Sequence, residues 1–493
     1  MKSLLWAAVF LALGAGISAS GDEKAPNVLF IISDDLSTAL SGYGDPHCQT
    51  PNLDRLAARG VSFSNAYCQF PLCGPSRASL FSGQYPLTTG ILKNNVPLPD
   101  ATVTLSRHFL NHGYWSGRVG KIYHMDIPHH VILGHEGADH PPSWTEAYNI
   151  RALETFHPGR VRNVTSPQTV ELYPELQKQW DQGTLSASTI KKLKGGHVWV
   201  IVETDEREGE LADTLAVDQA LRVLQKRAQE LEPFFLAVGL IRPHFPFIAP
   251  TEHFAAYPIE DMPLPEVSPE HLKTIPQQEH RPDLKVGQRD RQEIRQAYYA
   301  SISYMDEEVG RLLDEVDRLS LRDDTLIVFV SDHGYLLGEQ RTWQKNQLWE
   351  EATRVPLIIS APGQKVRGET SDEIVELIDL YPTLVDLAGL PPQPAAQGVS
   401  LRPLLEDPTG GQLSRQEAFL QTKRGFGLRH GQWSYMWYPP FKKHPEGAML
   451  YDMEADPKQT RNLAVLPEWA TLRDQLHERL LARIEMAQKT AHR

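Results

Sequence analysis

Four short apolar runs constrain the fold more than any other feature, because each ends abruptly in charged or imidazole side chains. The runs are NVLFIISDD, GYWSGRVGKIYH, PFFLAVGLIRPH and TLIVFVSDHG, and a fifth, VPLIISAPG, follows the last of them. They are continuous rather than alternating, which is typical of strands buried on both faces of a parallel sheet. Helical patterns lie between them, over residues 290–319 and 372–390. The sequence therefore predicts an α/β fold with a mostly parallel sheet covered on both faces by helices.

The polar ends of these runs predict one shared site. They carry the pairs Asp34 and Asp35, Lys121 and His124, Arg242 and His244, and Asp332 and His333. In sheets of this kind the binding crevice lies at the carboxyl ends of the strands. One strand that ends in two aspartates is weak evidence for a site. Four strands that all end in charged or imidazole side chains indicate that these side chains meet.

The aspartates predict a site for a hard cation. Asp34, Asp35 and Asp332 offer the oxygen ligands that Ca²⁺ or Mg²⁺ accepts. A single Asp-Asp pair at a strand end is about as often a helix cap or a turn. A further aspartate beside His333 at a second strand end favours the cation, which would polarise a bound oxyanion.

The stretch FPLCGPSRASLFSG, residues 70–83, places Cys73 in a tight turn before a predicted helix. A helix N-terminus beside Arg77 favours an anion or a thiolate. The alternative is a small buried thiol. A cysteine protease would need an activating histidine and would not explain the paired carboxylates. The chain has three cysteines, so at least one is unpaired; Cys48 and Cys68 could form a bridge that leaves Cys73 alone.

Four basic side chains complete the set of candidates. Lys121, His124, His244 and Lys345 could neutralise a sulfate or phosphate and move protons. Each residue by itself is more often an ordinary surface residue. Only their joint position at the strand ends gives the prediction weight.

Charge and the N-terminus restrict the class of protein. The formal net charge of −13 argues against nucleic acid as a partner, although a local cationic pocket can still bind an anionic substrate. Residues 1–20 combine Lys2, the apolar stretch 4–13 and small residues at 18–20, which predicts a cleaved secretory signal, with a membrane anchor as the alternative. No later stretch predicts a membrane span. We expect an exported protein, periplasmic or secreted, and lysosomal if eukaryotic.

The chain divides into two predicted parts. A catalytic domain is expected over residues 25–400, with two loop-rich insertions near 125–196 and 247–290. A connection rich in Pro and Gly follows, at 390–411. A small C-terminal α+β subdomain is expected over 411–493, with the strand-like pieces GFGLRHGQWSYMWY and AMLYDM and a terminal helix near 467–489.

Several motifs resemble one enzyme family. CGPSRASLFSG is similar to the signature C-x-P-S-R of the formylglycine-dependent type I sulfatases, and NVLFIISDD and VFVSDHG resemble the family's two metal strands. GKIYH, RPHFPF and SDHGYLLGEQRTWQK resemble its iduronate-2-sulfatase branch, and LYDMEADPKQTRNLA its C-terminal subdomain. The resemblance covers nearly the whole chain after residue 20. It implies an alkaline-phosphatase-like sandwich, with a large mostly parallel sheet flanked by helices and a smaller C-terminal α+β subdomain.

The resemblance also implies the chemistry. A formylglycine-generating maturation enzyme would convert Cys73 to an aldehyde, formylglycine, and one Ca²⁺ would be bound by residue 73 and by Asp34, Asp35, Asp332 and His333. One hydroxyl of the hydrated aldehyde, held on Ca²⁺, would attack the sulfur of a sulfated saccharide. The other hydroxyl, once deprotonated, would expel sulfate and regenerate the aldehyde.

The same resemblance assigns the remaining roles. Arg77 would stabilise the hydrated aldehyde, and His124 would take the proton that releases sulfate. Lys121, His244 and Lys345 would hold the sulfate group. Either His244 or Lys345 would protonate the leaving oxygen.

The resemblance to the iduronate-2-sulfatase branch predicts exo-acting removal of a 2-O-sulfate from a terminal uronic acid of a glycosaminoglycan-like saccharide. Arg341 and Lys93 are candidates for binding its carboxylate, and Tyr335 and Trp343 for facing the ring. The stretch QYPLTTGILKNN lacks the arginine that the branch carries there. The alternatives are therefore a sulfatase for a neutral sulfated sugar of an algal polysaccharide, a phosphatase or phosphodiesterase of the same superfamily, and a non-catalytic sulfoglycan-binding protein.

Overall fold

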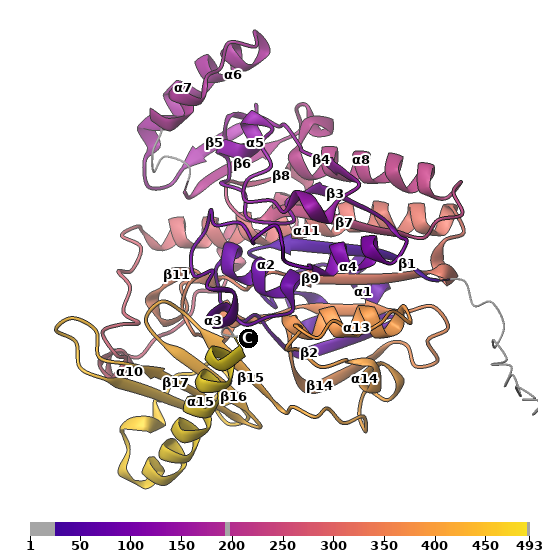
Figure 1. Ribbon diagram of the computed structural model, residues 1–493. Helices are drawn as coiled ribbons and strands as arrows, with labels where there is room; N and C mark the ends of the chain where they lie inside the picture. The colour runs from indigo at the N-terminus through magenta and orange to yellow at the C-terminus, as the bar shows by residue number, and fades with distance from the viewer. Residues whose placement is uncertain (1–24, 193–197, 491–493) are drawn as a thin grey trace, which may run out of the picture.

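The computed structural model describes residues 25–192 and 198–490, and a nine-stranded mixed sheet runs through its centre (Figure 1). The strand order is β12-β2-β13-β9-β1-β7-β3-β4, and β14 also pairs with β2. The strands are β1 (Asn27–Asp34), β2 (Val61–Tyr67), β3 (Trp115–Gly120), β4 (Glu146–Tyr148), β7 (Phe234–Pro243), β9 (Thr325–Ser331), β12 (Arg354–Val355), β13 (Leu357–Ser360) and β14 (Glu369–Glu376).

The four strands predicted to end in polar residues are parallel neighbours. β1 lies between β9 and β7, with Val28 opposite both Leu326 and Phe235, and β3 pairs with the other side of β7. Their carboxyl ends therefore lie at one edge of the sheet. This arrangement is what brings residues from distant parts of the sequence together.

The prediction that VPLIISAPG adds another parallel strand is wrong. It forms β12 and β13, and both run antiparallel to their neighbours. A parallel return needs a crossover that passes over the face of the sheet, usually a helix. The one α-helix in residues 332–356 is the short α12 (Glu350–Thr353), so the chain stays at the carboxyl edge and re-enters the sheet from there.

Helices cover both faces of the sheet, as predicted. Leu29 and Ile31 of β1 pack with α1 (Pro51–Ala57), α8 (Ala212–Arg227) and α11 (Gln288–Arg318) in one apolar cluster. The alternate residues Val28, Phe30 and Ile32 pack on the other face with α2 (Cys73–Ser82), α4 (Leu105–Asn111), α13 (Leu380–Leu387) and α14 (Arg402–Glu406). These five apolar side chains of β1 are all fully buried, which explains why this part of its sequence is continuously apolar.

The predicted helix over 372–390 is only half correct. Its first part is β14, which pairs in parallel with β2, and the helix α13 starts at Leu380. Ile374 and Val375 are buried, whereas Asp372 is exposed. Because β-branched residues favour strands and the segment is short, its apolar spacing fits a half-buried edge strand as well as a helix.

The two predicted insertions hold short elements, in agreement with their loop-rich composition. The helices here and nearby are α3 (Pro86–Thr89), α5 (His129–Leu133), α6 (Tyr173–Asp181), α7 (Ala187–Lys192), α9 (Thr251–Ala255) and α10 (Pro269–Thr274). A three-stranded sheet contains β5 (Arg160–Asn163), β6 (Val200–Thr204) and β8 (Phe247–Pro250), and a two-stranded one contains β10 (Leu336–Leu337) and β11 (Trp343–Gln344). In Figure 1, α6 and α7 stand out from the body of the molecule.

The C-terminal part is an antiparallel sheet with a terminal helix, as the sequence predicts. The sheet contains β15 (Glu417–Gln421), β16 (Phe426–His430), β17 (Trp433–Tyr438) and β18 (Gly447–Asp452), and α15 (Ala470–Thr490) packs against it. A buried network joins this part to the main sheet. Arg415 forms ion pairs with Glu376, at 3.0 Å, and with Asp379, and the amide of Phe419 donates to Glu376.

The predicted signal peptide, residues 1–20, lies outside the described residues. Within the described ranges, no helix has both the length and the apolar character needed to cross a membrane. Cys48, Cys68 and Cys73 are all buried free thiols, so the bridge considered between Cys48 and Cys68 is not formed.

Candidate active site

Cys73 lies at the start of α2, in the turn that its sequence predicts. The backbone N–H of Gly74 donates to Asn94 Oδ1 at 2.9 Å. A Cβ atom at position 74 would lie 2.9 Å from the Cα of Asn94, so a residue larger than glycine would displace the loop that crosses this turn. The side chain of Cys73 is thereby fixed at the carboxyl edge of the sheet, where it is almost fully buried.

Three groups from three other parts of the chain contact the sulfur of Cys73. Asp34 Oδ1 lies at 3.3 Å, His333 Nε2 at 3.3 Å and Lys345 Nζ at 3.2 Å. Burial and the Asp34 carboxylate raise the pKa of the thiol, but Lys345 and Lys121 outweigh them and leave it below its ordinary value. The electrostatics at this position therefore stabilise an anion.

The group most suited to a metal ion consists of Asp34, Asp35, Cys73 and His333. One ligand atom from each lies within 4.8 Å of all the others, and all four residues are buried. Asp35 Oδ2 has no hydrogen-bond partner. Burial raises the pKa of Asp35 to about 7, although Lys345 opposes the shift. Two adjacent buried carboxylates, one with an oxygen that lacks a hydrogen-bond partner, fit a hard divalent cation.

Asp332, the other predicted ligand, lies beside this group but faces a different partner. Its Oδ2 accepts from Nε of Arg77 at 2.7 Å, and its Oδ1 accepts from the backbone N–H groups of His333 and Asp35 at 2.9 and 3.3 Å. The carboxylate raises the pKa of His333 to about 9, against the effect of burial. Through these hydrogen bonds Asp332 orients Asp35 and His333, two members of the metal group.

Arg77 is fully buried and held at several points. Besides Asp332, its guanidinium donates to the carbonyls of Lys121 and Ile122, and its Nη2 lies 3.5 Å from Asp34 Oδ1. These contacts leave the side chain little freedom. The positive charge is therefore fixed close to residue 73, which lies four positions earlier in α2.

The two predicted lysines pair with two different carboxylates of the site. Lys121, at the end of β3, forms an ion pair with Asp34, and Lys345, just after β11, forms one with Asp35. Lys121 is fully buried, and the side chain of Lys345 is 12% exposed. Two cations so close to one buried point make it a receptor for a small anion.

The two predicted histidines are neutral at neutral pH. His244 Nε2 lies 3.7 Å from Asp35 Oδ2, and burial, together with Lys345, holds its pKa well below its ordinary value. Burial and the nearby Lys121 lower the pKa of His124 to about 3, and its Nδ1 has no hydrogen-bond partner. Both imidazoles can therefore accept a proton.

The structure gives several other candidates a different setting. Arg242 faces away from Cys73 and donates both Nη2 hydrogens to Glu154, at 2.8 and 2.7 Å. Trp343 is packed edge-on against Trp199 and donates its Nε1 hydrogen to Asp283. These contacts are structural.

The candidates for binding the sugar differ in their distance from the cluster. Tyr335 is buried, stacks on Tyr298, and has a hydroxyl without a partner; Asp35 and Lys345 both influence its pKa, which burial raises well above the ordinary value. Lys93 is exposed, and its carbonyl lies beside Gly74. Arg341 instead lines a cavity of about 200 Å³.

Sequence reasoning missed two residues that support the site. Asn94 holds the turn of Cys73, and Glu154 holds Arg242 next to His244. Neither has a local signal, because Asn94 is 20 residues from its partner and Glu154 is 88 residues from its own.

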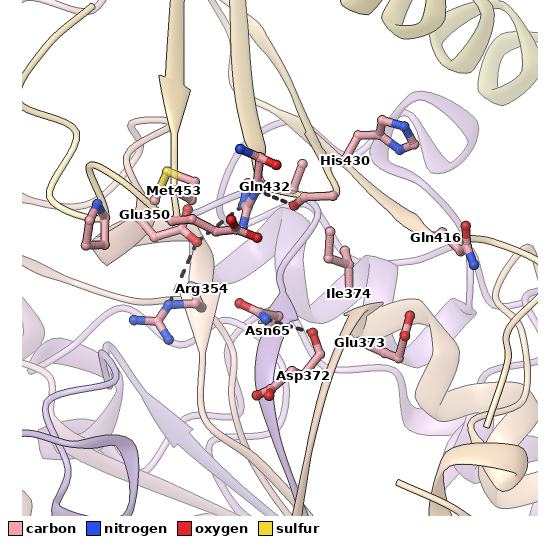
Figure 2. A pocket seen from close by; sticks show the side chains of 14 residues that line it. Asn65, Glu350, Arg354, Asp372, Glu373, Ile374, Gln416, His430, Gln432 and Met453 are labelled. Atoms are coloured by element: carbon pink, nitrogen blue, oxygen red, sulfur yellow. Dashed lines mark hydrogen bonds and ion pairs between the residues drawn. The ribbon is translucent and has the colours of Figure 1, made fainter. Parts of the chain in front are cut away.

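A cavity of about 580 Å³ lies elsewhere, at the junction with the C-terminal sheet (Figure 2). Its lining includes the acidic side chains Glu350, Asp372, Glu373 and Glu454 and the arginines Arg354 and Arg429. None of the residues that contact Cys73 lines it. The candidate chemistry is therefore in the buried cluster and not in this cavity.

Comparison with known proteins agrees with the geometry. Residues 26–390 match the sequence model of a family described as Sulfatase, and residues 338–486 match one described as N-sulphoglucosamine sulphohydrolase, C-terminal. Human iduronate 2-sulfatase is 32% identical over 440 residues, which cover 79% of this chain and 74% of the human protein.

Two further proteins extend the comparison. A protein of Formosa agariphila named ulvan-active sulfatase is 31% identical over 478 residues, covering 93% of this chain and 81% of its own. The solved structure of a phosphonate monoester hydrolase from Silicibacter pomeroyi superposes with a TM-score of 0.74 at 24% identity, over 94% of this chain and 96% of that one. The predicted alkaline-phosphatase-like fold is confirmed.

Proposed function

This chain belongs to the sulfatase family, and we propose that it removes a 2-O-sulfate from a terminal uronic acid of a glycosaminoglycan-like saccharide. Hydrolysis of sulfate esters of sugars is the general activity that its family and its relatives support. The observation that carries the proposal is the convergence of Lys121, Lys345 and His244 on the buried Asp34–Asp35–Cys73 cluster.

Lys121 and Lys345 bind the sulfate group in this proposal. Both ammonium groups are buried or nearly so, and both are fixed by carboxylates. Cations that are already oriented stabilise the charge that develops on the sulfate oxygens without reorganising. His244 adds a hydrogen bond from the end of the neighbouring strand.

Residue 73 supplies the nucleophile. Conversion of Cys73 to formylglycine, as in the sulfatases that the sequence resembles, would place a hydrated aldehyde where the sulfur now lies. Asp34, Asp35 and His333 would hold a calcium ion, which would supply positive charge beside residue 73. The fixed positive charge of Arg77 would stabilise the hydrated aldehyde at residue 73.

The neutral histidines move the protons. His124 is the proposed base for residue 73. Its pKa of about 3 leaves the imidazole unprotonated at neutral pH, and negative charge that forms beside it during the reaction would raise its affinity for a proton. Lys345, which is protonated at neutral pH, or His244 once it has taken up a proton, gives the proton to the leaving sugar oxygen.

Lys93 is the best-placed candidate for the uronate carboxylate. It is exposed and directly precedes Asn94, which contacts the turn of Cys73. Arg341 is the second candidate, four residues before Lys345 in the chain. The relative named iduronate 2-sulfatase supports a uronate substrate, and the relative named ulvan-active sulfatase supports the alternative of a sulfated sugar from an algal polysaccharide.

The test is turnover of defined sulfated saccharides. Lys93→Met should cost on the order of 1–3 kcal/mol of transition-state binding on a uronate 2-sulfate and nothing on its carboxyl-reduced form. If neutral sulfated hexoses turn over faster than any uronate 2-sulfate, the uronate assignment fails and the general sulfatase activity stands.

The proposal has two further parts. Residues 1–20 direct export, so that the enzyme meets its substrate outside the cytoplasm. Residues 25–400 form the catalytic domain and 411–493 the C-terminal subdomain.

A further inference from the structure

We propose that a cationic clamp beside the active site binds a second anionic group of the saccharide, on a sugar next to the one that loses sulfate. The clamp consists of Arg281, Arg424, Phe441 and Lys442. It lies where the 247–290 insertion meets the loop between β17 and β18, which Figure 1 shows beside α10. The inference rests on the proposed function, because it extends the same substrate beyond Cys73.

Gln278 holds the parts of the clamp together. Its side-chain amide donates to the carbonyls of Pro439 and Pro445, at 3.1 and 2.8 Å, which lie at the two ends of the β17–β18 loop. Its own carbonyl accepts from Arg281 Nη1 at 3.3 Å and from Arg424 Nη1 at 3.5 Å. Two guanidinium groups therefore converge on a single carbonyl oxygen.

The protein neutralises this convergence only in part. The nearby carboxyl of Glu279 is buried, and Arg281 and Arg424 lower its pKa without overcoming the effect of burial, which raises it to about 7. In the part of the chain that the structure describes, no carboxylate lies within ion-pair distance of Arg281, Arg424 or Lys442. Like charges held at one point repel one another unless an anion lies between them. In a chain with a formal net charge of −13, a cluster of unpaired cations indicates an anionic ligand.

An exposed aromatic ring makes the site specific for a sugar. Phe441 is 40% exposed. The Lys442 ammonium lies 5.4 Å from its ring centroid, and the Arg424 guanidinium lies 5.9 Å from it. A flat apolar ring flanked by cations matches a sulfated saccharide, whose C–H face can stack on the ring while a sulfate or carboxylate pairs with the cations.

The clamp is continuous with the active site. Arg281 Nη2 donates to the carbonyl of Asn346 at 3.4 Å, and the amide of Asn346 donates to Pro71 at 2.8 Å. Asn346 follows Lys345 directly, and Pro71 precedes Cys73 by two residues. These contacts link the clamp to the loop that leads to Cys73, so a saccharide with its sulfate at Cys73 would extend toward the clamp.

The test compares two substrates in the mature enzyme. Arg424→Gln and Lys442→Gln should each raise KM about tenfold for a sulfated tetrasaccharide, since each removes a charge-assisted contact. Neither should change turnover of a monosulfated aryl ester, which is too small to reach the clamp. The matched control is Arg367→Gln, an exposed arginine that also donates to a backbone carbonyl. It lies in the loop between β13 and β14, at the opposite edge of the sheet.

Binding separates this inference from the proposed function. If calorimetry shows that the tetrasaccharide binds about tenfold more weakly to the two clamp variants than to the parent and to Arg367→Gln, the clamp stands, even if no sulfated saccharide is hydrolysed. Equal effects on the tetrasaccharide and the aryl ester, or no effect on either, would overturn it. A single-stranded oligonucleotide that bound more tightly than the tetrasaccharide, and lost affinity in the same variants, would overturn it as well.

Discussion

The ammonium nitrogen of Lys345 lies 3.2 Å from the sulfur of Cys73, although 272 residues separate them in the chain. A backbone hydrogen bond supports this contact. The amide of Asn346, next to Lys345, donates to the carbonyl of Pro71 in the loop that leads to Cys73. Burial alone would lower the pKa of Lys345, but Asp35 and Cys73 raise it well above its ordinary value. Lys345 is therefore protonated at neutral pH, beside the residue that we propose as the nucleophile.

Replacing Lys345 by Met should lower kcat/KM for any sulfate ester by about 10²–10³-fold, since it removes one fixed donor to the developing negative charge. Initial rates on an aryl sulfate would measure this. The control is Lys365→Met, an exposed lysine in the loop after β13, which should keep the parent rate. A Lys345→Met variant with the parent kcat/KM would contradict the role assigned to this residue.

Removal of divalent cations should abolish activity and lower the melting temperature. Without a cation, the buried carboxylates of Asp34 and Asp35 repel each other and Asp35 Oδ2 lacks a partner. The measurement is thermal unfolding and turnover after exhaustive chelation and after return of Ca²⁺. Unchanged rate and melting temperature in the chelated protein would refute the metal site, and restoration by Zn²⁺ alone would favour a phosphatase.

The junction with the C-terminal sheet should be sensitive to loss of Arg415. This buried side chain neutralises the buried carboxylates of Glu376 and Asp379. Arg415→Met leaves Asp379 without a cationic partner and Glu376 with only Arg483, at 3.9 Å, and should lower the free energy of unfolding by about 3–5 kcal/mol. Chemical denaturation followed by fluorescence would measure the loss.

Arg402→Met is the matched control for that experiment. Arg402 pairs with Glu406, but the two side chains are 49% and 65% exposed. The change should therefore cost less than about 1 kcal/mol. Equal losses in the two variants would show that the buried network does not stabilise the junction.

Stability should fall as the pH rises through neutrality, in part because of Glu279. Burial raises the pKa of this carboxyl to about 7, so the folded state holds a proton that the unfolded chain releases near its ordinary value of 4.5. The contribution is present below the lower value and is lost as the pH rises through the upper one. Glu279→Gln should therefore gain stability over the parent between pH 5 and pH 8, by on the order of 3 kcal/mol.

Gln at position 279 can still accept the hydrogen bond that Leu348 donates to Glu279 Oε1 at 2.8 Å. The comparison therefore isolates the charge. Chemical denaturation of both proteins at several pH values is the measurement. Parallel curves for parent and variant across this range would show that Glu279 does not titrate near neutrality.

The sequence was sufficient to predict the edge of the sheet at which the site forms. β1, β3, β7 and β9 each bury both faces, so their continuous apolar runs and abrupt polar ends survive as a linear signal. The direction of β13 and the strand β14 could not be predicted in the same way. Both depend on pairing with β2, which lies 296 residues earlier in the chain for Ile358 and 308 for Glu369, and not on local pattern.

The contacts that support the site could not be predicted from the sequence either. Asn94 and Glu154 are ordinary polar residues in loops, and only the folded chain places them against Gly74 and Arg242. The role of Trp343 beside the sugar stays a prediction. The contacts of its indole with Trp199 and Asp283, like those of Asn94 and Glu154, could not be predicted from the motif in which it stands.

The most direct test of the account is release of inorganic sulfate from a disaccharide with a terminal 2-O-sulfated uronic acid, with the intact mass of the enzyme determined on the same sample. The account predicts that sulfate is released only by protein in which Cys73 has become an aldehyde or its hydrate, and that Cys73→Ala releases none. Full activity from protein that retains the Cys73 thiol, or no sulfate from fully converted protein supplied with Ca²⁺, would contradict it.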